Sequence, residues 1–315
     1  MKKIILILGL TNLISCVKPQ KIDDIISIKE VERIETKLCS DNMMGRQVFT
    51  PSIEKAADFI SDEMKQIGLK MLPGSSSYFQ PFSYNRQKLA NVVGILQGRS
   101  KKDEYVIFSA HYDHLGVEKS NTMKDSIYNG ANDDASGVTA VLQLAKYYKT
   151  INNNERTLIF VAFTAEEVGG YGSQYFSKQL DPTKIAAMFN IEMIGTESKW
   201  GKNSAYITGY EKTDVGEILK RNLIGTAFKF YPDPYAGEDL FYRSDNATLA
   251  KLGVPAHTIS TSKMDNEPHY HKVDDEIGTL NIKNMTEIIK SIAISAQSIV
   301  SSKDTPTRVK AEDLD

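Results

Sequence analysis

Five short segments of the chain carry side chains that can bind metal ions. The segments are His111-Tyr-Asp113-His114, Gly130 to Gly137 with Asp133-Asp134, Thr164-Ala-Glu166-Glu167, Asn190-Ile-Glu192 and His269-Tyr-His271. Apolar runs that are typical of strands precede most of them, and an open α/β sheet places its chemistry at the carboxyl ends of its strands. Histidine, aspartate and glutamate in these proportions suit two divalent ions, with zinc the first expectation. The residues therefore indicate a metallohydrolase.

The apolar run Val106–Ala110 leads directly to His111, and Asp113 follows two residues later. Side chains two residues apart share one face of an extended segment. We therefore expect the Asp113 carboxylate to accept the far ring N–H of His111 and to leave its other nitrogen for a metal. A single histidine after a strand is more often structural, and this pairing makes the two interpretations equal. His114 is expected outside the set of direct ligands.

Asp133 lies between two glycines, just before a helix predicted at 136–149. A carboxylate in that position can simply cap the helix, and we interpret Asp134 in this way. Considered alone, Asp133 would also be a cap. Considered with the other motifs, it is the natural bridging ligand, because two cations about 3.5–4 Å apart need a shared anion between them.

The clearest single signal is the run 157–163 that ends in two adjacent carboxylates, Glu166 and Glu167. Because neighbouring side chains diverge, one can bind a metal while the other faces a water molecule at the metal. A helix N-terminus would also favour acidic residues, but it does not explain the buried strand that leads to them. Glu192 ends another apolar run, and His271 lies in a patternless segment where paired histidines favour function.

The remaining pattern alternates strands with helices. Strands are predicted at 91–96, 105–110, 157–163, 187–191, 205–208 and 256–259, and helices at 51–67, 136–149, 171–179, 214–224, 239–252 and 282–301. Thr50 is expected to cap the first helix, which starts at Pro51 and ends at Gly68. Continuous apolar strands are typical of a sheet covered on both faces. The class is therefore α/β with a mostly parallel central sheet.

Composition excludes several classes of protein. The chain has 315 residues and a net charge of −2, so nothing indicates a nucleic-acid partner or a basic membrane-binding patch. Its two cysteines, Cys16 and Cys39, exclude a disulfide framework. No Pro/Gly/Ser-rich linker or repeat divides the chain, which favours one domain at 31–302 followed by a polar tail at 303–315.

The pattern of the first residues indicates a targeting segment. Lys2 and Lys3 precede an apolar stretch from Ile4 to Ile14, which is too short for a span of roughly 20 residues. Leu13-Ile14-Ser15-Cys16 resembles the bacterial lipobox, in which the cysteine is lipidated and becomes the first mature residue. We therefore predict a lipoprotein signal peptide at 1–15, a tether at 16–30 and a lipid anchor on Cys16 in the bacterial cell envelope. An ordinary signal peptide is the alternative.

The order and context of the five metal motifs resemble the co-catalytic zinc aminopeptidase family. That family includes bacterial leucyl-type aminopeptidases, glutamate carboxypeptidase II and the glutaminyl cyclases. The resemblance covers residues 36 to 300 and includes Cys39-Ser-Asp-Asn-Met-Met-Gly-Arg46 and Asn91-Val-Val-Gly-Ile-Leu-Gln-Gly98. It implies a three-layer α/β/α fold of the zinc-exopeptidase type, with a central, mostly parallel mixed sheet.

The resemblance also implies a role for each site residue. His111 and Glu192 would hold one zinc, Glu167 and His271 the other, and Asp133 would bridge them. Glu166 would be the general base toward the bridging water, Asp113 would orient His111, and Tyr270 would steady the oxyanion. Two positions depart from the family pattern. Glu192 replaces the usual aspartate, and Asn246 replaces a histidine that is not a ligand, so only local hydrogen bonds should change there.

The leading interpretation is a metal-dependent aminopeptidase that acts on peptides. Two alternatives stay open: a glutaminyl cyclase, which on this scaffold uses one zinc and no strand-end histidine, and a catalytically inactive binding scaffold. The glutamate-releasing carboxypeptidases need extra domains for which this chain has no room. The pocket for the first side chain is expected among the aromatic residues of 225–245, which could equally be core: Phe228, Phe230, Tyr231, Tyr235, Phe241 and Tyr242. Oligomeric state is not predicted.

Overall fold

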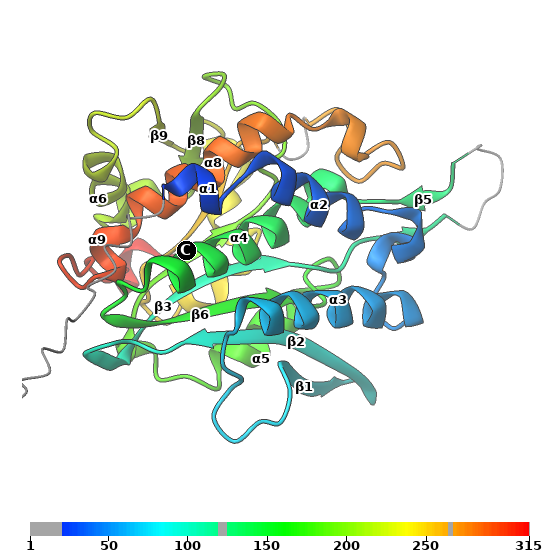
Figure 1. Cartoon of the computed structure of the whole chain (residues 1–315), viewed down its shortest axis with the longest axis horizontal. Helices are drawn as coiled ribbons and strands as arrows, with labels where there is room; N and C mark the ends of the chain where they lie inside the picture. Colours follow the sequence, from blue (N-terminus) through cyan, green and yellow to red (C-terminus); the bar gives the residue numbers. More distant parts are fainter. Residues whose placement is uncertain (1–20, 119–124, 264–266, 315) are drawn as a thin grey trace, which may run out of the picture.

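An eight-stranded mixed sheet forms the centre of the computed structural model, which describes residues 21–118, 125–263 and 267–314 (Figure 1). In spatial order the strands are β1 (Phe79–Tyr84), β2 (Gln87–Leu96), β6 (Arg156–Phe163), β3 (Lys101–His111), β7 (Ile185–Ile191), β10 (Ala256–Ser260), β8 (Ser204–Ile207) and β9 (Lys229–Pro232). The four central strands β6, β3, β7 and β10 are parallel to one another. Antiparallel pairs flank them on both sides. The predicted mixed sheet is therefore confirmed.

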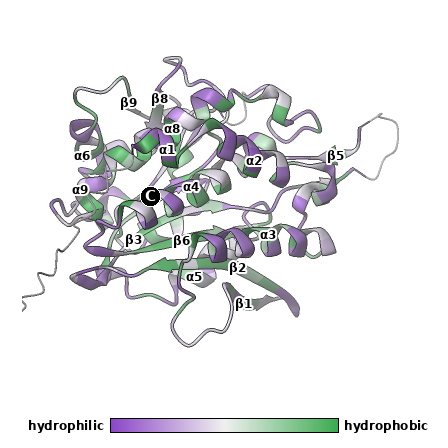
Figure 2. Cartoon of the chain, in the orientation of Figure 1, coloured by the Kyte–Doolittle hydropathy of each residue, from purple (hydrophilic) through white to green (hydrophobic). Residues whose placement is uncertain are grey.

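Helices cover both faces of this sheet. One face carries α1 (Ile22–Ile25), α2 (Ile28–Leu38), α3 (Pro51–Ile67), α4 (Ser136–Ile151) and α8 (Ile282–Ser295), while the other carries α5 (Tyr171–Ser177) and α7 (Asn246–Ala250). Successive strand residues alternate between the two layers, since Phe108 packs in the core cluster on the α4 side and Ile107 in the cluster on the α5 side. Apolar residues accordingly concentrate along the central strands (Figure 2). The fold is a three-layer α/β/α arrangement.

Several predicted elements have different bounds in the structure. The helix expected at 239–252 is only α7, because residues 240–242 form a short 3-10 turn and the chain turns again before Asn246. The helix expected at 282–301 divides at Ala296 into α8 and α9 (Gln297–Val300), and the helix expected at 214–224 is α6 (Val215–Asn222). Thr50 does not cap α3, because its hydroxyl donates to the carbonyl of Gln47 instead. Pro51 and Gly68 bound that helix as expected.

The described parts of the predicted tether and tail pack more closely than the sequence indicated. Residues assigned to the tether include α1 and the start of α2, and Ile25 and Ile26 are buried. In the predicted tail, Val309 is buried and the Asp304 carbonyl accepts a hydrogen bond from Arg156. The predicted signal peptide and Cys16 lie outside the described residues. Among the helices of the described part, none has the length and apolarity needed to cross a bilayer.

Candidate metal centre

The predicted ligands converge at the carboxyl ends of the central strands. His111 is the last residue of β3, Glu192 follows β7 directly, and Glu166 and Glu167 lie just beyond β6. Parallel pairing of β3 with both β6 and β7 brings these ends together. Asp133 joins them from the turn before α4. The sheet thus gathers residues that are far apart in the sequence.

A first cluster consists of His111, Asp133 and Glu192, all buried. His111 Nε2 lies 3.2 Å from Asp133 Oδ1 and 4.0 Å from Glu192 Oε1. Neither His111 Nε2 nor Glu192 Oε2 has a hydrogen-bond partner within the described residues. Buried polar atoms are seldom left unpaired. A cation bound in this cluster would give both residues a partner.

A second cluster surrounds the other oxygen of the same aspartate. His271 Nε2 lies 3.2 Å from Asp133 Oδ2 and 3.2 Å from Glu167 Oε2. Asp133 therefore presents one carboxylate oxygen to each cluster, as expected of a bridging ligand. Imidazole and carboxylate groups are among the donors that zinc prefers in proteins. The residues present thus fit a pair of zinc ions on either side of Asp133.

His114 was expected to lie outside the set of direct ligands, but its side chain contacts two of them. Its Nδ1 is 2.8 Å from Glu167 Oε1 and 3.8 Å from Asp133 Oδ2, and the side chain is buried. It contacts the Glu167 oxygen that faces away from His271. We interpret His114 as a hydrogen-bond donor that fixes the orientation of Glu167 and leaves Oε2 free for the metal.

The predicted role of the Asp113 carboxylate is wrong in its geometry. His111 Nδ1 lies 3.2 Å from the backbone carbonyl of Asp113, whereas the carboxylate oxygen is 4.0 Å away. That carboxylate accepts hydrogen bonds from the backbone N–H groups of Glu166 and Glu167 instead, at 3.1 and 3.3 Å. Asp113 still orients His111 through its main chain, but its side chain holds the Glu166-Glu167 turn.

Two further residues fix the Asp133 loop, and the sequence did not single out either as part of the site. Arg46 is fully buried and donates to five backbone carbonyls, those of Leu38, Tyr112, Asn129, Gly130 and Asp133. Asp275 accepts the N–H groups of Asn132 and Asp133 at 2.9 and 3.0 Å. The nearby Gly-Arg46 motif was the available signal for Arg46, whereas nothing in the sequence placed Asp275 beside Asp133.

Asp134 is not the N-cap residue of α4, which is Ala135, but its side chain contacts the first turn of that helix. Its carboxylate accepts the N–H of Gly137 at the start of α4, at 3.0 Å. It also accepts the N–H groups of Met193 at 3.1 Å and His111 at 3.3 Å. One buried carboxylate therefore ties the start of α4 to the ends of β3 and β7.

The two remaining predicted residues, Glu166 and Tyr270, line a small cleft at the centre. Arg243 and Ser244, which were not predicted, line it with them beside the carboxylates and His271. The Tyr270 ring stacks on the His271 ring with centroids 3.8 Å apart. His269 is turned away, and its Nδ1 lies 3.2 Å from Asp274. Glu166 has no side-chain hydrogen bond in the described part of the structure, so its carboxylate is available to the cleft.

Concentrated negative charge sets the electrostatics of the centre. Burial opposes the charged form of His111, but the adjacent carboxylate of Asp133 and the charges of Glu166 and Asp134 raise its pKa well above the ordinary value. Burial raises the pKa of Glu166, and the carboxylates of Glu192 and Asp245 add to this effect. So many acids at one point are costly without compensating positive charge. The centre is therefore suited to cations.

The aromatic residues of 225–245 divide between core and site. Phe230 and Phe241 are each buried in one of the two large core clusters, and Phe228 packs against the cluster that contains Phe230. Tyr231 stacks on Trp200. Tyr235 alone packs with Tyr270 in a small cluster that also contains Met193, Tyr206 and Leu240. This cluster adjoins the cleft, so it replaces the predicted aromatic set as the candidate wall for a substrate side chain.

Comparison with known proteins decides the family. The model for "Peptidase family M28" matches residues 91–295, a segment that contains all five metal-binding motifs. The chain belongs to peptidase family M28. Aminopeptidase YwaD of Bacillus subtilis is 22% identical over 284 residues, which is 86% of this chain and 56% of that protein. Across the first relatives, several of which are named as zinc metalloproteases, the match spans only 31% to 56% of their length.

Solved structures of the same architecture include enzymes of two kinds. The zinc aminopeptidase BSAP from Bacillus subtilis superposes with a TM-score of 0.71 at 16% identity, covering 92% of this chain and 98% of that one. A glutaminyl cyclase of Porphyromonas gingivalis superposes with a TM-score of 0.67 at 16% identity, covering 88% and 99%. At these identities the likeness establishes the fold of this M28 chain. The activity must be argued from the site.

Proposed function

We propose that this M28 chain is a zinc-dependent aminopeptidase that releases N-terminal residues from peptides. The observation that carries the proposal is Asp133, whose two oxygens face two separate imidazole and carboxylate clusters. His111 and Glu192 would hold one zinc ion, and Glu167 and His271 the other. When bound, the ions would polarise the peptide carbonyl and acidify water. Paired sites of this kind favour hydrolysis over the single-zinc cyclase.

Glu166 carries the proton in this proposal. Its carboxylate accepts a proton from the attacking water and returns it to the leaving amine when the C–N bond breaks, so the carboxylate is regenerated. The Asp113 carboxylate accepts hydrogen bonds from the backbone N–H groups of Glu166 and Glu167. These bonds fix the turn, so the side chains of the base Glu166 and the ligand Glu167 point in different directions. The Tyr270 hydroxyl, beside His271, would donate a hydrogen bond to the oxyanion.

The test uses purified protein loaded with zinc and a mixture of free and N-acetylated peptides, with products followed by mass spectrometry. Stepwise loss of N-terminal residues from the free peptides only is the expected result. Glu166→Gln should lose at least 100-fold in turnover, on the order expected for a general base. Glu32→Gln, an exposed acid on α2, is the matched control and should retain full activity. Loss of ammonia from N-terminal glutamine, with the peptide bonds left intact, would establish the cyclase instead.

We also propose that the chain is lipid-anchored to a bacterial cell envelope through Cys16. The two lysines, the short apolar run and the lipobox-like Leu13-Ile14-Ser15-Cys16 support this proposal. Metabolic labelling with a fatty-acid analogue tests it. Label on the wild type that is absent from Cys16→Ser is expected, and an unlabelled wild type found free in the medium would contradict it.

A further inference from the structure

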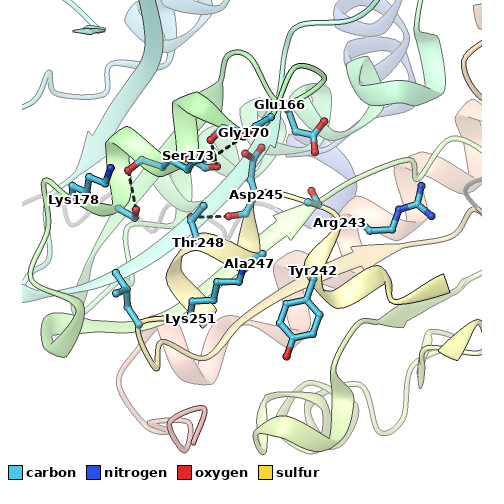
Figure 3. Close-up of a pocket in the computed structure, with 15 residues that line it drawn as sticks. Glu166, Gly170, Ser173, Lys178, Tyr242, Arg243, Asp245, Ala247, Thr248 and Lys251 are labelled. Carbon is cyan, nitrogen blue, oxygen red and sulfur yellow. Dashed lines mark hydrogen bonds between the residues drawn. The ribbon is translucent and has the colours of Figure 1, made fainter. Parts of the chain in front are cut away.

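A groove between α5 and α7 opens beside Glu166. Its volume is about 610 Å³. One wall runs from Glu166 along α5 to Lys178, and the other from Tyr242 along α7 to Leu252. Glu166, Arg243 and Ser244 line both this groove and the metal cleft, so the two spaces are continuous. Figure 3 shows Glu166 and Asp245 facing one end of the groove.

The inner end of the groove holds a carboxylate without a partner. Asp245 is 2% exposed, and neither of its carboxylate oxygens has a hydrogen-bond partner among the residues that the structure describes. Buried carboxylates normally accept several hydrogen bonds. A group that enters the groove with N–H donors would supply them. The hydroxyl groups of Ser173 and Thr248 add further polar lining.

The outer end of the groove is positively charged. Lys178 follows α5 directly and Lys251 follows α7, and both side chains are exposed. Neither forms an ion pair with any described carboxylate, although Lys251 Nζ lies 5.8 Å from the Tyr242 ring centroid. A lysine at a helix C-terminus also stabilises that helix. The helix effect does not explain why both lysines border one groove that leads to the catalytic base.

The length of the groove can be compared with that of a peptide. Both helices start at the catalytic end, α5 after Gly170 and α7 after Asp245, and both end at the lysines. The seven residues of α5 rise about 10 Å at roughly 1.5 Å per residue. An extended peptide covers that distance with about three residues. A chain that starts at the scissile bond would therefore reach the lysines after two or three residues.

We propose that this groove binds the part of a short peptide that follows the scissile bond, and that Lys178 and Lys251 recognise its C-terminal carboxylate. Asp245 accepts a backbone N–H of the same segment. The substrates are then peptides of about three or four residues with a free carboxyl end. The proposal rests on the proposed aminopeptidase function and deepens it, because it assigns the substrate class.

The test compares pairs of peptides that differ only in C-terminal amidation. The zinc-loaded protein should cleave a free-acid tetrapeptide with a kcat/KM about three- to tenfold above that of its amide, mainly through KM, as exposed ion pairs allow. The double variant Lys178→Ala/Lys251→Ala should lose this preference, so that it cleaves the acid and the amide with the same kcat/KM. Lys303→Ala, an exposed lysine outside the groove lining, is the matched control. The preference should also fade in an octapeptide pair, whose carboxylate lies beyond the lysines.

Each outcome separates the two proposals. Equal cleavage of the acid and the amide by the wild type overturns the groove assignment and leaves the aminopeptidase proposal intact. A preference that survives in the double variant also overturns the role of the lysines. No cleavage of either peptide, with zinc bound, overturns both proposals.

Discussion

At the scale of single residues, ligands that terminate strands could be predicted because a buried apolar run specifies both a strand and its end. His111, Glu167 and Glu192 were found in this way, and the structure brings them to one centre with Asp133 and His271. The predicted contact between the Asp113 carboxylate and His111 was wrong for a geometric reason. Two residues share a face only while the strand continues, and β3 ends at His111. Beyond that point the chain turns, which directs the Asp113 carboxylate to the Glu166 amide.

Replacing His114 should weaken the half of the centre that contains Glu167 and His271. Because His114 contacts Glu167 Oε1 at 2.8 Å, His114→Ala frees Glu167 to rotate. We expect a loss of about 10- to 100-fold in the affinity for one of two zinc ions. Competition titration with a chelator measures this. His269→Ala is the matched control, since His269 faces Asp274. Unchanged zinc affinity in His114→Ala would refute the interpretation.

At the scale of elements, the core strands and the long helices followed from periodicity, whereas short and peripheral elements did not. Residues 16–30 were predicted to be a tether, but Ile25 and Ile26 in this segment are buried. The following helix α2 buries Val31, Ile34 and Leu38 at helical spacing and packs against α4 and α8. The edge strands β1 and β9 lack a continuous apolar run and so were missed. The loops that position Asp133 depend on contacts with distant residues, and local patterns carry no signal for such contacts.

Arg46 connects the segment before α3 to the Asp133 loop, so its loss should affect both stability and the site. The ammonium group of a lysine has only three N–H donors, so it cannot donate to all five carbonyls that the Arg46 guanidinium reaches. We expect Arg46→Lys to lower the free energy of unfolding by about 3–5 kcal/mol, because each buried carbonyl left without a donor costs about 1–3 kcal/mol. Urea unfolding of the metal-free protein measures this. Arg33→Lys, which changes a half-exposed pair with Glu63, should cost less than about 1 kcal/mol. Equal effects would contradict the assignment.

His257 on β10 should make stability depend on pH. Burial lowers its pKa to about 4, and its ring contacts the Thr208 carbonyl and the Thr213 hydroxyl. The unfolded chain, with an ordinary histidine pKa near 6.5, binds the extra proton first as the pH falls. Stability is therefore complete above about pH 6.5 and falls by about 3 kcal/mol down to pH 4 from this group.

The variant His257→Asn should remove that part of the pH dependence. Urea titrations of metal-free protein between pH 7 and pH 4 compare its slope with that of the wild type. The difference between slopes isolates His257 from the carboxylates, which titrate in both proteins. Parallel slopes would show that His257 is not held neutral.

At the scale of the whole molecule, one mixed sheet gathers the candidate ligands of the two proposed metal sites around a shared carboxylate. The family match and the likeness to solved structures establish the family and the fold. The groove between α5 and α7 leads away from this centre. Both helices start at its catalytic end and end next to Lys178 and Lys251. Neither the groove nor its lysines could be predicted from sequence, since α7 was expected to begin at 239.

The most direct test of the central claim is the zinc stoichiometry of the purified protein, measured by elemental analysis and titration calorimetry. We expect two zinc ions per chain in the wild type and in Glu166→Gln. We expect fewer than two in Asp133→Asn, which keeps the shape of the bridging residue but removes its charge. A wild-type chain that binds one zinc ion or none at saturating metal, or an Asp133→Asn variant that still binds two with unchanged affinity, would contradict the two-metal centre.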